Sequence, residues 1–542
     1  MTDKIIELIK NKIVTIYFIL LFILLAIIYF PTFFNAPRSD WWESLYFFHS
    51  IYSSPLPYQW LQIFNTDCFG HVTFRPLAHM VLFFQHSVFG SRFIFMHIIN
   101  FFLYFCSLLL LYRFAIIFGF NRMLTALFIG LFTFLFSHFD IISWTVHSHL
   151  ILSFCLFLLG FIMYVQFLKT GKKMFLFFIV TAFLIGMLCY EAFIFWPLAI
   201  MFLSSIKSIT NSNNLSNTKL VRKSNLVIIG ITYCFYAGIF ILTRLISMYD
   251  DTWRQTYALA LELSSIKRIL ESFYAVSFNT LYNGIVVNLI PTVTASLRPD
   301  IYSSNVRMGG LLDVYRPVLG FAMRISSVII VLLIIGIVTY LVKRKRFDTL
   351  KTFILFSSLL FSFSFLFFHF KYFSNREYFY DFQQFRYQYI PNAWIVLTAL
   401  LFIDRAIMHI SKKRIKVITY ILVLMITMIN IYHTMPCIRF ETRQMAPLNR
   451  MLVNIKRGIK SKQINEDNKI YIADNIVCKF PKMCWNVEIG RFMKGTYQWL
   501  FDKREIKYFS STLKESSWII DKKDFSVKSR VNNVGLKNSK VN

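Results

Sequence analysis

One acidic residue stands out near the start of the chain because it falls where a long apolar segment ends. Asp40 follows the apolar run 13–34 and precedes Trp41 and Trp42. A carboxylate held close to hydrocarbon is costly to keep charged, so it usually has a partner or a task. Partial desolvation also raises its basicity, which suits a general base. The alternative is an Asp that caps the helix indicated by the sequence WWESLYFFHSIY.

A basic residue that suits phosphate chemistry lies further along the same stretch. Arg75 comes directly before Pro76, after a segment that contains Asp67 and Gly70. The guanidinium fork binds two oxygens of one phosphate group at once, whereas a lone Arg at this place more often anchors the chain at the membrane surface. The apolar segment 76–90 is too short to cross a bilayer, and we expect it to lie along the surface.

Two further charged residues lie beside apolar segments later in the chain. Glu191 interrupts the apolar run 174–206, which predicts a helical hairpin with Glu191 at its outer tip. Arg386 stands in the sequence FRYQYIP, just before another apolar segment. Glu191 could bind a polar ligand or pair with Arg386, and the alternative is a hairpin-tip residue that meets headgroup water.

The composition determines which kind of protein must position these residues. Of the 542 residues, 56% are hydrophobic and 16% are charged, and the mean hydropathy is +0.55. A soluble domain is about 45–50% apolar and about one quarter charged, and here the apolar residues come in long blocks. This excludes a soluble enzyme, a disordered protein and a disulfide scaffold. The chain is therefore expected to be mainly α-helical and to cross a membrane many times.

The apolar blocks predict about eleven transmembrane helices. A helix needs about 20 mostly apolar residues to cross the hydrocarbon core, and irregular chain exposed to lipid is not tolerated there. Together the spans would form one transmembrane module over residues 1–434. The expected spans are 13–34, 93–112, 123–139, 149–168, 174–190, 192–206, 226–246, 318–342, 350–371, 390–408 and 415–434.

The basic residues predict how these spans are oriented. The chain has 58 Lys and Arg against 27 Asp and Glu, a net charge of +31, and short loops rich in Lys and Arg stay in the cytoplasm. Every second connection is basic, which predicts a cytoplasmic N-terminus and outer loops at 35–92, 247–317 and 372–389. Because long loops often carry function, we expect the active face to be the outer one. No module that binds nucleic acid accompanies the charge.

The tail, residues 435–542, differs from the rest of the chain. A helical apolar stripe covers 442–460, alternation predicts strands at 469–476 and 505–510, and 485–501 could form a helix. We expect a small extracytoplasmic α/β domain with a frayed basic end. Cys478 and Cys484 could form a disulfide there or remain free thiols.

The candidate residues, taken in order, resemble the motifs of GT-C membrane glycosyltransferases. The nearest branch is the protein O-mannosyltransferase-like group with tetratricopeptide tails and its bacterial relatives, and the similarity covers about residues 13–410. Two departures are that Trp41 stands where that branch often has a second acid, which Glu43 could replace only on a helical turn, and that the tail has no tetratricopeptide repeats. The matching residues are Asp40, Asp67, Gly70, the sequence FRPL at 74–77, Asn100, the sequence YEAFIFWP at 190–197 and the sequence FRYQYIP at 385–391.

The resemblance implies that a sugar moves from a polyprenyl-phosphate donor to a glycan, lipid or protein acceptor at the outer face of a bacterial inner membrane, with inversion. Asp40 would be the general base, and Arg75 and Arg386 would stabilise the donor phosphate. No cofactor is required, although Asp40, Glu43, Asp67 and Asp140 could hold a divalent metal. His138, His147 and His149 flank Asp140 and could line the acceptor site, or serve only in packing. The implied substrate-binding residues are Glu43, Asp67, Glu191, His138, Asp140, Tyr387 and Tyr389.

Two other functions fit parts of the sequence. An O-antigen polymerase or ligase shares the many spans and the Arg-rich outer chemistry, but an acid directly after the first span and a folded tail are not expected of it. A lipid-linked sugar transporter, which is not an enzyme, should show broken helices, charges inside the membrane or matching halves. The sequence shows few charges within spans and no convincing repeat.

Overall fold

The computed structural model describes residues 2–35, 75–89, 92–206, 218–246, 266–289, 309–371, 388–409, 413–461 and 463, together with four short strands between 470 and 529. This part of the chain contains 15 α-helices and is mainly α-helical, as predicted. The predicted domains 1–434 and 435–542 are therefore described in part.

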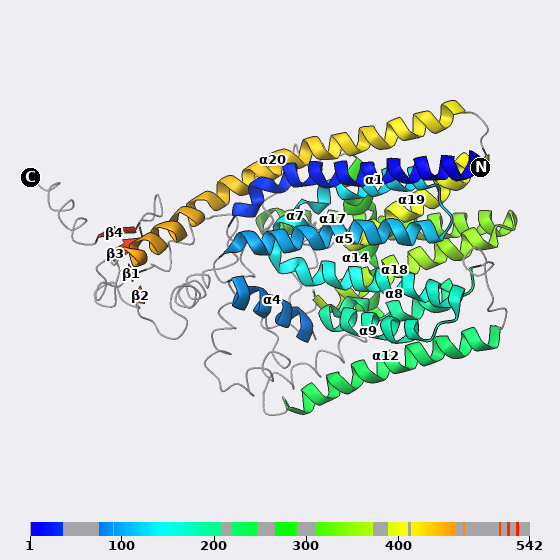
Figure 1. Cartoon of the computed structure of the whole chain (residues 1–542), viewed down its shortest axis with the longest axis horizontal. Coiled ribbons are helices and arrows are strands. Elements are labelled where there is room, and N and C mark those ends of the chain that lie inside the picture. The colour runs from blue at the N-terminus through cyan, green and yellow to red at the C-terminus, as the bar shows by residue number, and fades with distance from the viewer. Residues whose placement is uncertain are drawn as a thin grey trace, which may run out of the picture.

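Eight helices of the described residues are long and apolar enough to cross a membrane (Figure 1). They match eight of the eleven predicted spans, and the chain is a multi-pass helical membrane protein. The helices are α1 (Thr2–Tyr29, extended by the 3-10 helix η1, Phe30–Phe34), α5 (Phe93–Ile117), α8 (Ser148–Thr170), α12 (Thr218–Ile246), α17 (Gly309–Lys343), α18 (Phe347–Lys371), α19 (Tyr389–His409) and α20 (Lys413–Lys460).

A ninth candidate span is broken. The predicted straight helix 123–139 is instead α6 (Arg122–Thr133) followed, after a 59° bend, by η2 (Phe136–His138) and α7 (Phe139–Ser143). Side chains from other helices bind the backbone groups at the break: Asn430 Oδ1 accepts from the Phe136 N–H at 2.8 Å, and Asn288 Oδ1 accepts from the Ser137 N–H at 3.2 Å. A helix kinks where such side chains replace its own hydrogen bonds.

The predicted hairpin 174–206 is present, but its limbs are shorter than full spans. The first limb is α9 (Met174–Cys189), and the second is the succession η4 (Glu191–Phe193), η5 (Trp196–Leu198) and α10 (Ala199–Leu203). Sixteen helical residues reach about 24 Å, less than the ~30 Å hydrocarbon core. The prediction of eleven full spans is therefore wrong for these two segments, and the described residues give eight spans, or nine with the bent pair.

Helices α8 and α9 pack closely through two reciprocal Gly–Phe contacts. A Cβ added at Gly160 of α8 would lie 2.4 Å from Phe183 of α9, and one added at Gly186 of α9 would lie 2.6 Å from Phe157 of α8. Each glycine thus receives the aromatic ring of the other helix. This close approach fixes where α9 ends, and so positions Glu191.

Two other helices do not span the bundle. The short α4 (Pro76–Phe89) packs against α5, α8 and α9 and buries His79, Leu82 and His86, so the segment expected on the surface is a helix with one face buried in the protein. The predicted amphipathic segment of the long loop forms α14 (Ile266–Leu281), which continues as the π-helix η6 (Tyr282–Val286) and α15 (Val287–Leu289) and packs on α17 and α18.

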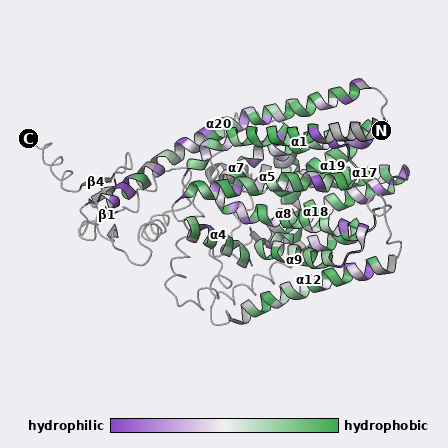
Figure 2. Cartoon of the chain, in the orientation of Figure 1, coloured by the Kyte–Doolittle hydropathy of each residue, from purple (hydrophilic) through white to green (hydrophobic). Residues whose placement is uncertain are grey.

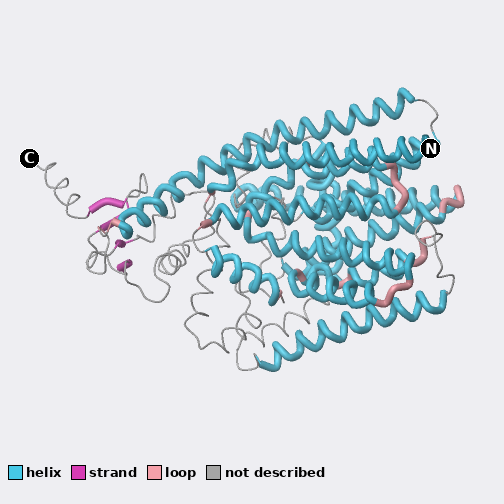
Figure 3. The backbone as a smooth tube through the Cα atoms, viewed as in Figure 1, coloured by secondary structure: helices cyan, strands magenta, loops and turns pink. Residues whose placement is uncertain are grey.

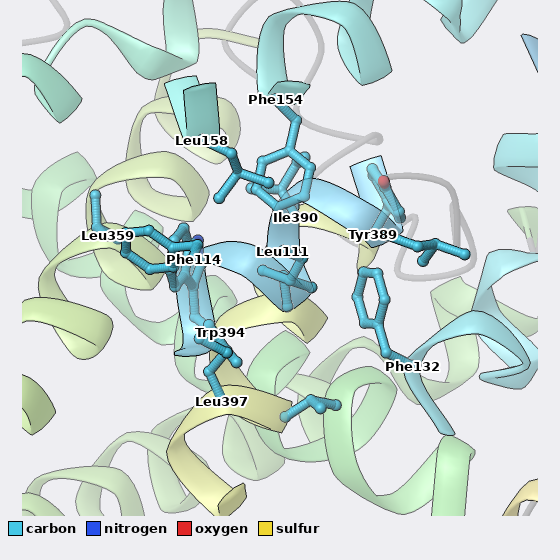
Figure 4. Close-up of a cluster of buried hydrophobic side chains, with 14 of the residues drawn as sticks. Leu111, Phe114, Phe132, Phe154, Leu158, Leu359, Tyr389, Ile390, Trp394 and Leu397 are labelled. Carbon is cyan, nitrogen blue, oxygen red and sulfur yellow. The ribbon is translucent and has the colours of Figure 1, made fainter. Parts of the chain in front are cut away.

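The core of the bundle is aromatic and joins five of these helices (Figure 4). Trp394 of α19 lies edge-on to Phe114 of α5 with ring centroids 5.9 Å apart, and its ring centroid lies 5.2 Å from that of Trp196. The labelled members are Leu111, Phe114, Phe132, Phe154, Leu158, Leu359, Tyr389, Ile390, Trp394 and Leu397.

The described connections that carry Lys and Arg, 171–173 and 344–346, lie at the end of the bundle where α1 begins (Figure 1). We call the opposite end, where α1 finishes and α5, α8 and α19 begin, the distal end. This arrangement agrees with the predicted alternation of loops. Which end faces the cytoplasm stays a prediction from the charge pattern.

Beyond the distal end, α20 leads to four short strands (Figure 3). They are β1 (Ile470–Tyr471), β2 (Phe509–Ser510), β3 (Trp518–Ile520) and β4 (Val527–Ser529), in the sheet order β2-β1-β3-β4. Strand β1 is parallel to β2 and β3, and β4 is antiparallel to β3. Strands β1 and β2 fall within the two predicted strands, whereas the predicted helix 485–501, Cys478 and Cys484 lie outside the described residues.

Candidate functional site

Arg75 and Glu191 form a bidentate ion pair at the junction of α4 and the α9–α10 hairpin. Arg75 Nε donates to Glu191 Oε2, and Arg75 Nη2 donates to Glu191 Oε1. Both side chains are mostly buried, with exposed fractions of 16% and 14%. Charged hydrogen bonds made by both arms of the guanidinium are among the stronger and more directional contacts in proteins.

Local sequence explains how the two partners are presented. Pro76 is the first residue of α4, a position that suits its fixed φ and its missing N–H, and the Arg75 carbonyl accepts from the Ala78 N–H at 3.0 Å. On the other side, Tyr190 leaves α9 in an extended conformation (φ −157°, ψ 112°) and Glu191 begins a 3-10 turn. The side chains of residues 116 positions apart thereby meet.

The ring of Tyr190 covers the Arg75 guanidinium. Arg75 Cζ lies 4.0 Å from the centroid of the Tyr190 ring, a cation–π geometry worth about 0.5–2 kcal/mol. The Tyr190 ring stacks on His149 of α8, with centroids 5.8 Å apart, and on Phe363 of α18, with centroids 6.0 Å apart. The hairpin and α4 therefore meet at this cation, and α8 and α18 contact the tyrosine ring that covers it.

This geometry changes the expectations for two residues. Glu191 pairs with Arg75 in the structure, whereas Arg386, the partner considered from the sequence, lies outside the described residues. Because Nε and Nη2 of Arg75 are bonded to Glu191, a phosphate at this guanidinium would share it with the carboxylate. The local formal charge of the pair is zero.

A second polar group lies inside the bundle at the helix break. We call Ser137, His138, Asn288, Asn392 and Asn430 the buried polar cluster, since each is at most 2% exposed. It joins the break after α6 to α15, α19 and α20. Asn392 Nδ2 donates to Ser137 Oγ at 2.8 Å, Ser137 Oγ donates to Asn288 Oδ1 at 3.1 Å, and Asn430 Nδ2 donates to the Asn288 carbonyl at 2.7 Å.

The hydrogen bonds of this cluster determine the form of His138. The Tyr104 hydroxyl donates its single proton to the Thr133 carbonyl at 2.9 Å, so it can only accept at its 3.1 Å contact with His138 Nδ1. At the other ring nitrogen, Asn392 Nδ2 lies 3.1 Å from His138 Nε2 and acts as the donor. The network therefore assigns a neutral imidazole with its proton on Nδ1.

One acceptor of the cluster has no hydrogen-bond partner among the described residues. Asn392 Oδ1 is buried and faces Gly284, where an added Cβ would lie 3.6 Å from that oxygen. Gly284 belongs to the π-helix η6, a type of helix that is frequent at functional sites. A buried, unpaired carbonyl in such a place costs free energy.

Tyr389, expected to bind substrate, lies in the core. It is fully buried, its hydroxyl bonds Ser107 Oγ, and its ring packs against Phe132, with centroids 5.5 Å apart (Figure 4). Its edge-on contact with His138, at 5.3 Å between centroids, links it to the buried polar cluster. Its place in the structure is therefore in the packing around His138.

Other residues singled out from the sequence have the following places. Asn100 of α5 donates to the carbonyls of Ile141 and Ile142 at 2.9 and 2.7 Å and so holds α7. Asp140 lies within α7. Among the described residues no group of three or more His, Cys, Asp or Glu could hold a metal ion. Asp40, Glu43, Asp67, Arg386 and Tyr387 lie outside the described residues.

Sequence reasoning missed most of the buried polar cluster. Asn288, Asn392 and Asn430 each stand inside apolar sequence, in VVNLI, IPNAW and MINIY. An amide in such a segment must find a partner, because hydrocarbon offers none. The sequence therefore indicates that each of these three amides needs a polar partner. It does not indicate that the three belong to one cluster.

Neither a family model nor a curated protein sequence matches this chain.

Proposed function

We propose that this chain is a GT-C-type membrane glycosyltransferase. It moves a sugar from a polyprenyl-phosphate donor to an acceptor at the outer face of a bacterial inner membrane, and the distal end of the bundle is that face. The observation that carries the proposal is the Arg75–Glu191 pair. Two residues from separate motifs of the resemblance, FRPL and YEAFIFWP, meet side by side at the hairpin tip.

The proposed reaction is a single displacement. Asp40 takes the proton of an acceptor hydroxyl, the hydroxyl oxygen attacks the anomeric carbon, and the bond from that carbon to the phosphate oxygen breaks. Polyprenyl phosphate leaves, and the sugar is inverted. Arg386 and Arg75 stabilise the departing phosphate, an electrostatic contribution of a few kcal/mol in a site that excludes water.

Within this proposal the Glu191 carboxylate has a positioning role. It holds the guanidinium of Arg75 by both arms, and Tyr190 limits its movement from one face. A cation fixed before the donor arrives needs no reorganisation when charge develops on the phosphate. His149, whose ring stacks on that of Tyr190, would border the same site, with His147 next to His149.

The test is transfer by the purified protein in nanodiscs, supplied with a radiolabelled polyprenyl-phosphate sugar and a crude cell-envelope acceptor fraction. Asp40→Asn should abolish transfer while leaving yield and thermal stability unchanged. Asp250→Asn, in the long loop, is the matched control and should retain activity. Full activity in Asp40→Asn would rule out Asp40 as the base.

A second candidate is a transporter of lipid-linked sugars, favoured by the broken helix α6–α7 and the buried polar cluster beside it. Transporters place substrate sites at such breaks. A transporter would move a fluorescent polyprenyl-phosphate sugar across proteoliposomes and leave the bond between sugar and phosphate intact. The glycosyltransferase would cleave that bond.

A further inference from the structure

The long helix α20 leaves the bundle at its distal end. Its apolar window ends at Arg439, but the helix continues without interruption to Lys460. These 21 further residues extend about 31 Å along the helix axis. Figure 1 shows this part projecting past the ends of α1 and α5, and Figure 2 shows hydrophilic residues gathering along it.

Four arginines share one face of this projecting helix. Arg439, Arg443, Arg450 and Arg457 are spaced by 4, 7 and 7 residues, which places them within about 40° of one another at 3.6 residues per turn. We call them the arginine ladder. The side chains of Arg439, Arg443 and Arg457 are exposed, whereas Ile455, about 160° away around the helix, is fully buried.

The ladder stands close to the place where the first long loop begins. Asn449 Nδ2 donates to the Phe34 carbonyl at 2.9 Å, which ties α20 to the end of η1. Partial burial and the charge of Arg92, at the start of α5, lower the pKa of the Lys456 ammonium. Residues 439–460 contain six basic residues and only one acidic residue, Glu441, so the potential around this helix is strongly positive.

We propose that the arginine ladder is a docking surface for the acceptor of the reaction, and that this acceptor is a linear polyanionic glycan with repeated carboxylate or phosphate groups. That the bound glycan is the acceptor rests on the proposed function. The charge complementarity is its main support, because guanidinium forks bind carboxylate and phosphate groups by two hydrogen bonds. A row of cations along one helix face suits an extended chain of anions.

A lipid surface does not explain the whole ladder. The headgroup layer beyond the hydrocarbon is about 5–8 Å thick on each side. Arg450 and Arg457 lie about 16 and 27 Å beyond Arg439 along the helix, which places them outside that layer for a helix along the bilayer normal. Arginines that only anchor a span are expected at its edge, which accounts for Arg439 alone.

A protein partner is also disfavoured. Binding surfaces for proteins are dominated by aromatic and Arg anchors around a desolvated centre. Phe440 is the one aromatic residue between Arg439 and Lys460. The exposed apolar side chain described on this part of the helix is Val453, a single aliphatic group and not an aromatic anchor.

The experiment measures binding of fluorescent polygalacturonate to the full chain in nanodiscs of phosphatidylcholine, with neutral maltooligosaccharide of equal length as the reference probe. Arg450→Gln with Arg457→Gln should weaken polygalacturonate binding about tenfold, since exposed ion pairs contribute up to about 1 kcal/mol each. Arg414→Gln with Lys416→Gln removes the same charge at the other end of the same helix and is the matched control. Binding should also weaken steeply between 50 and 500 mM salt.

Three results would overturn the proposal. The first is that the full chain shows no measurable binding of polygalacturonate. The second is that both double variants lose the same amount of binding. The third is that the full chain does not bind polygalacturonate but floats with vesicles that contain phosphatidylglycerol, and that this flotation requires the arginine ladder. The assay contains no sugar donor, so failure of the proposed transfer reaction would leave the binding result standing. Conversely, transfer without polyanion binding would support the proposed enzyme and overturn the proposed docking surface.

Discussion

Arg75 and Glu191, 116 residues apart, bind each other through Nε and Nη2 of the guanidinium. This pair joins the start of α4 to the tip of the α9–α10 hairpin. Tyr190 covers the guanidinium from one face. Because α4 follows the first long loop and the hairpin packs on α8 and α18, this contact fixes where that loop returns to the bundle.

Removing one partner of the pair should destabilise the protein. Arg75→Gln or Glu191→Gln leaves a mostly buried charge without its partner, at a cost of up to about 3–5 kcal/mol. The melting temperature in detergent should fall in both variants, and transfer should fall with it. Arg113→Gln removes an exposed arginine of α5 and should leave the melting temperature unchanged.

The double variant Arg75→Met with Glu191→Leu separates stability from chemistry. It removes both charges together, so its melting temperature should lie above that of either single variant. If Arg75 also serves the donor phosphate, transfer should stay lost although stability recovers. Recovery of both would mean that the pair only positions α4.

The buried polar cluster makes a separate prediction. Asn392→Leu removes the donor to Ser137 Oγ and to His138 Nε2. Each buried group left unpaired costs about 1–3 kcal/mol, so the melting temperature should drop clearly. Thr419→Ala removes a bond from a half-buried side chain to its own helix, to the Ile415 carbonyl, and should have little effect. An unchanged melting temperature in Asn392→Leu would contradict the assigned network.

A side chain at Gly284 requires the end of the Ile395 side chain to move. A Cβ at Gly284 would lie 2.5 Å from Ile395 Cδ1, so Gly284→Ala should lower the melting temperature. Ile395→Val deletes the clashing atom and should restore part of the loss. Gly238→Ala, in α12 where nothing lies within 4 Å, should be neutral or stabilising by up to about 1 kcal/mol. Equal effects at both glycines would refute the close approach.

Shortening the tail tests which part of it binds the polyanion. A chain ending after residue 461 keeps all of α20 and loses the strands. It should bind polygalacturonate within about twofold of the full chain, because the four arginines of the ladder remain. A chain ending after residue 439 loses three rungs of the ladder and should lose the binding. Size-exclusion chromatography checks that both chains remain monodisperse. Loss of binding in the longer chain would assign the site to the strands instead.

The sequence alone determined the class of protein and most of its helices. Long apolar blocks predict spans because a membrane-crossing helix must satisfy its backbone internally and present apolar side chains outward, and eight such helices are present. It also pointed to the hairpin around Glu191 and to strands near 470 and 509. These features depend on local composition and periodicity, which the sequence carries directly.

The tertiary structure decided what local patterns leave open. The segment 123–139 is equally apolar whether or not it bends, and the amides of Asn288 and Asn430, from distant segments, bind backbone N–H groups at the break. The sequence offered Arg386 or a polar ligand as the partner of Glu191, and in the structure Glu191 pairs with Arg75. Polar side chains in a membrane bundle must find one another, and which ones meet depends on how the helices are arranged.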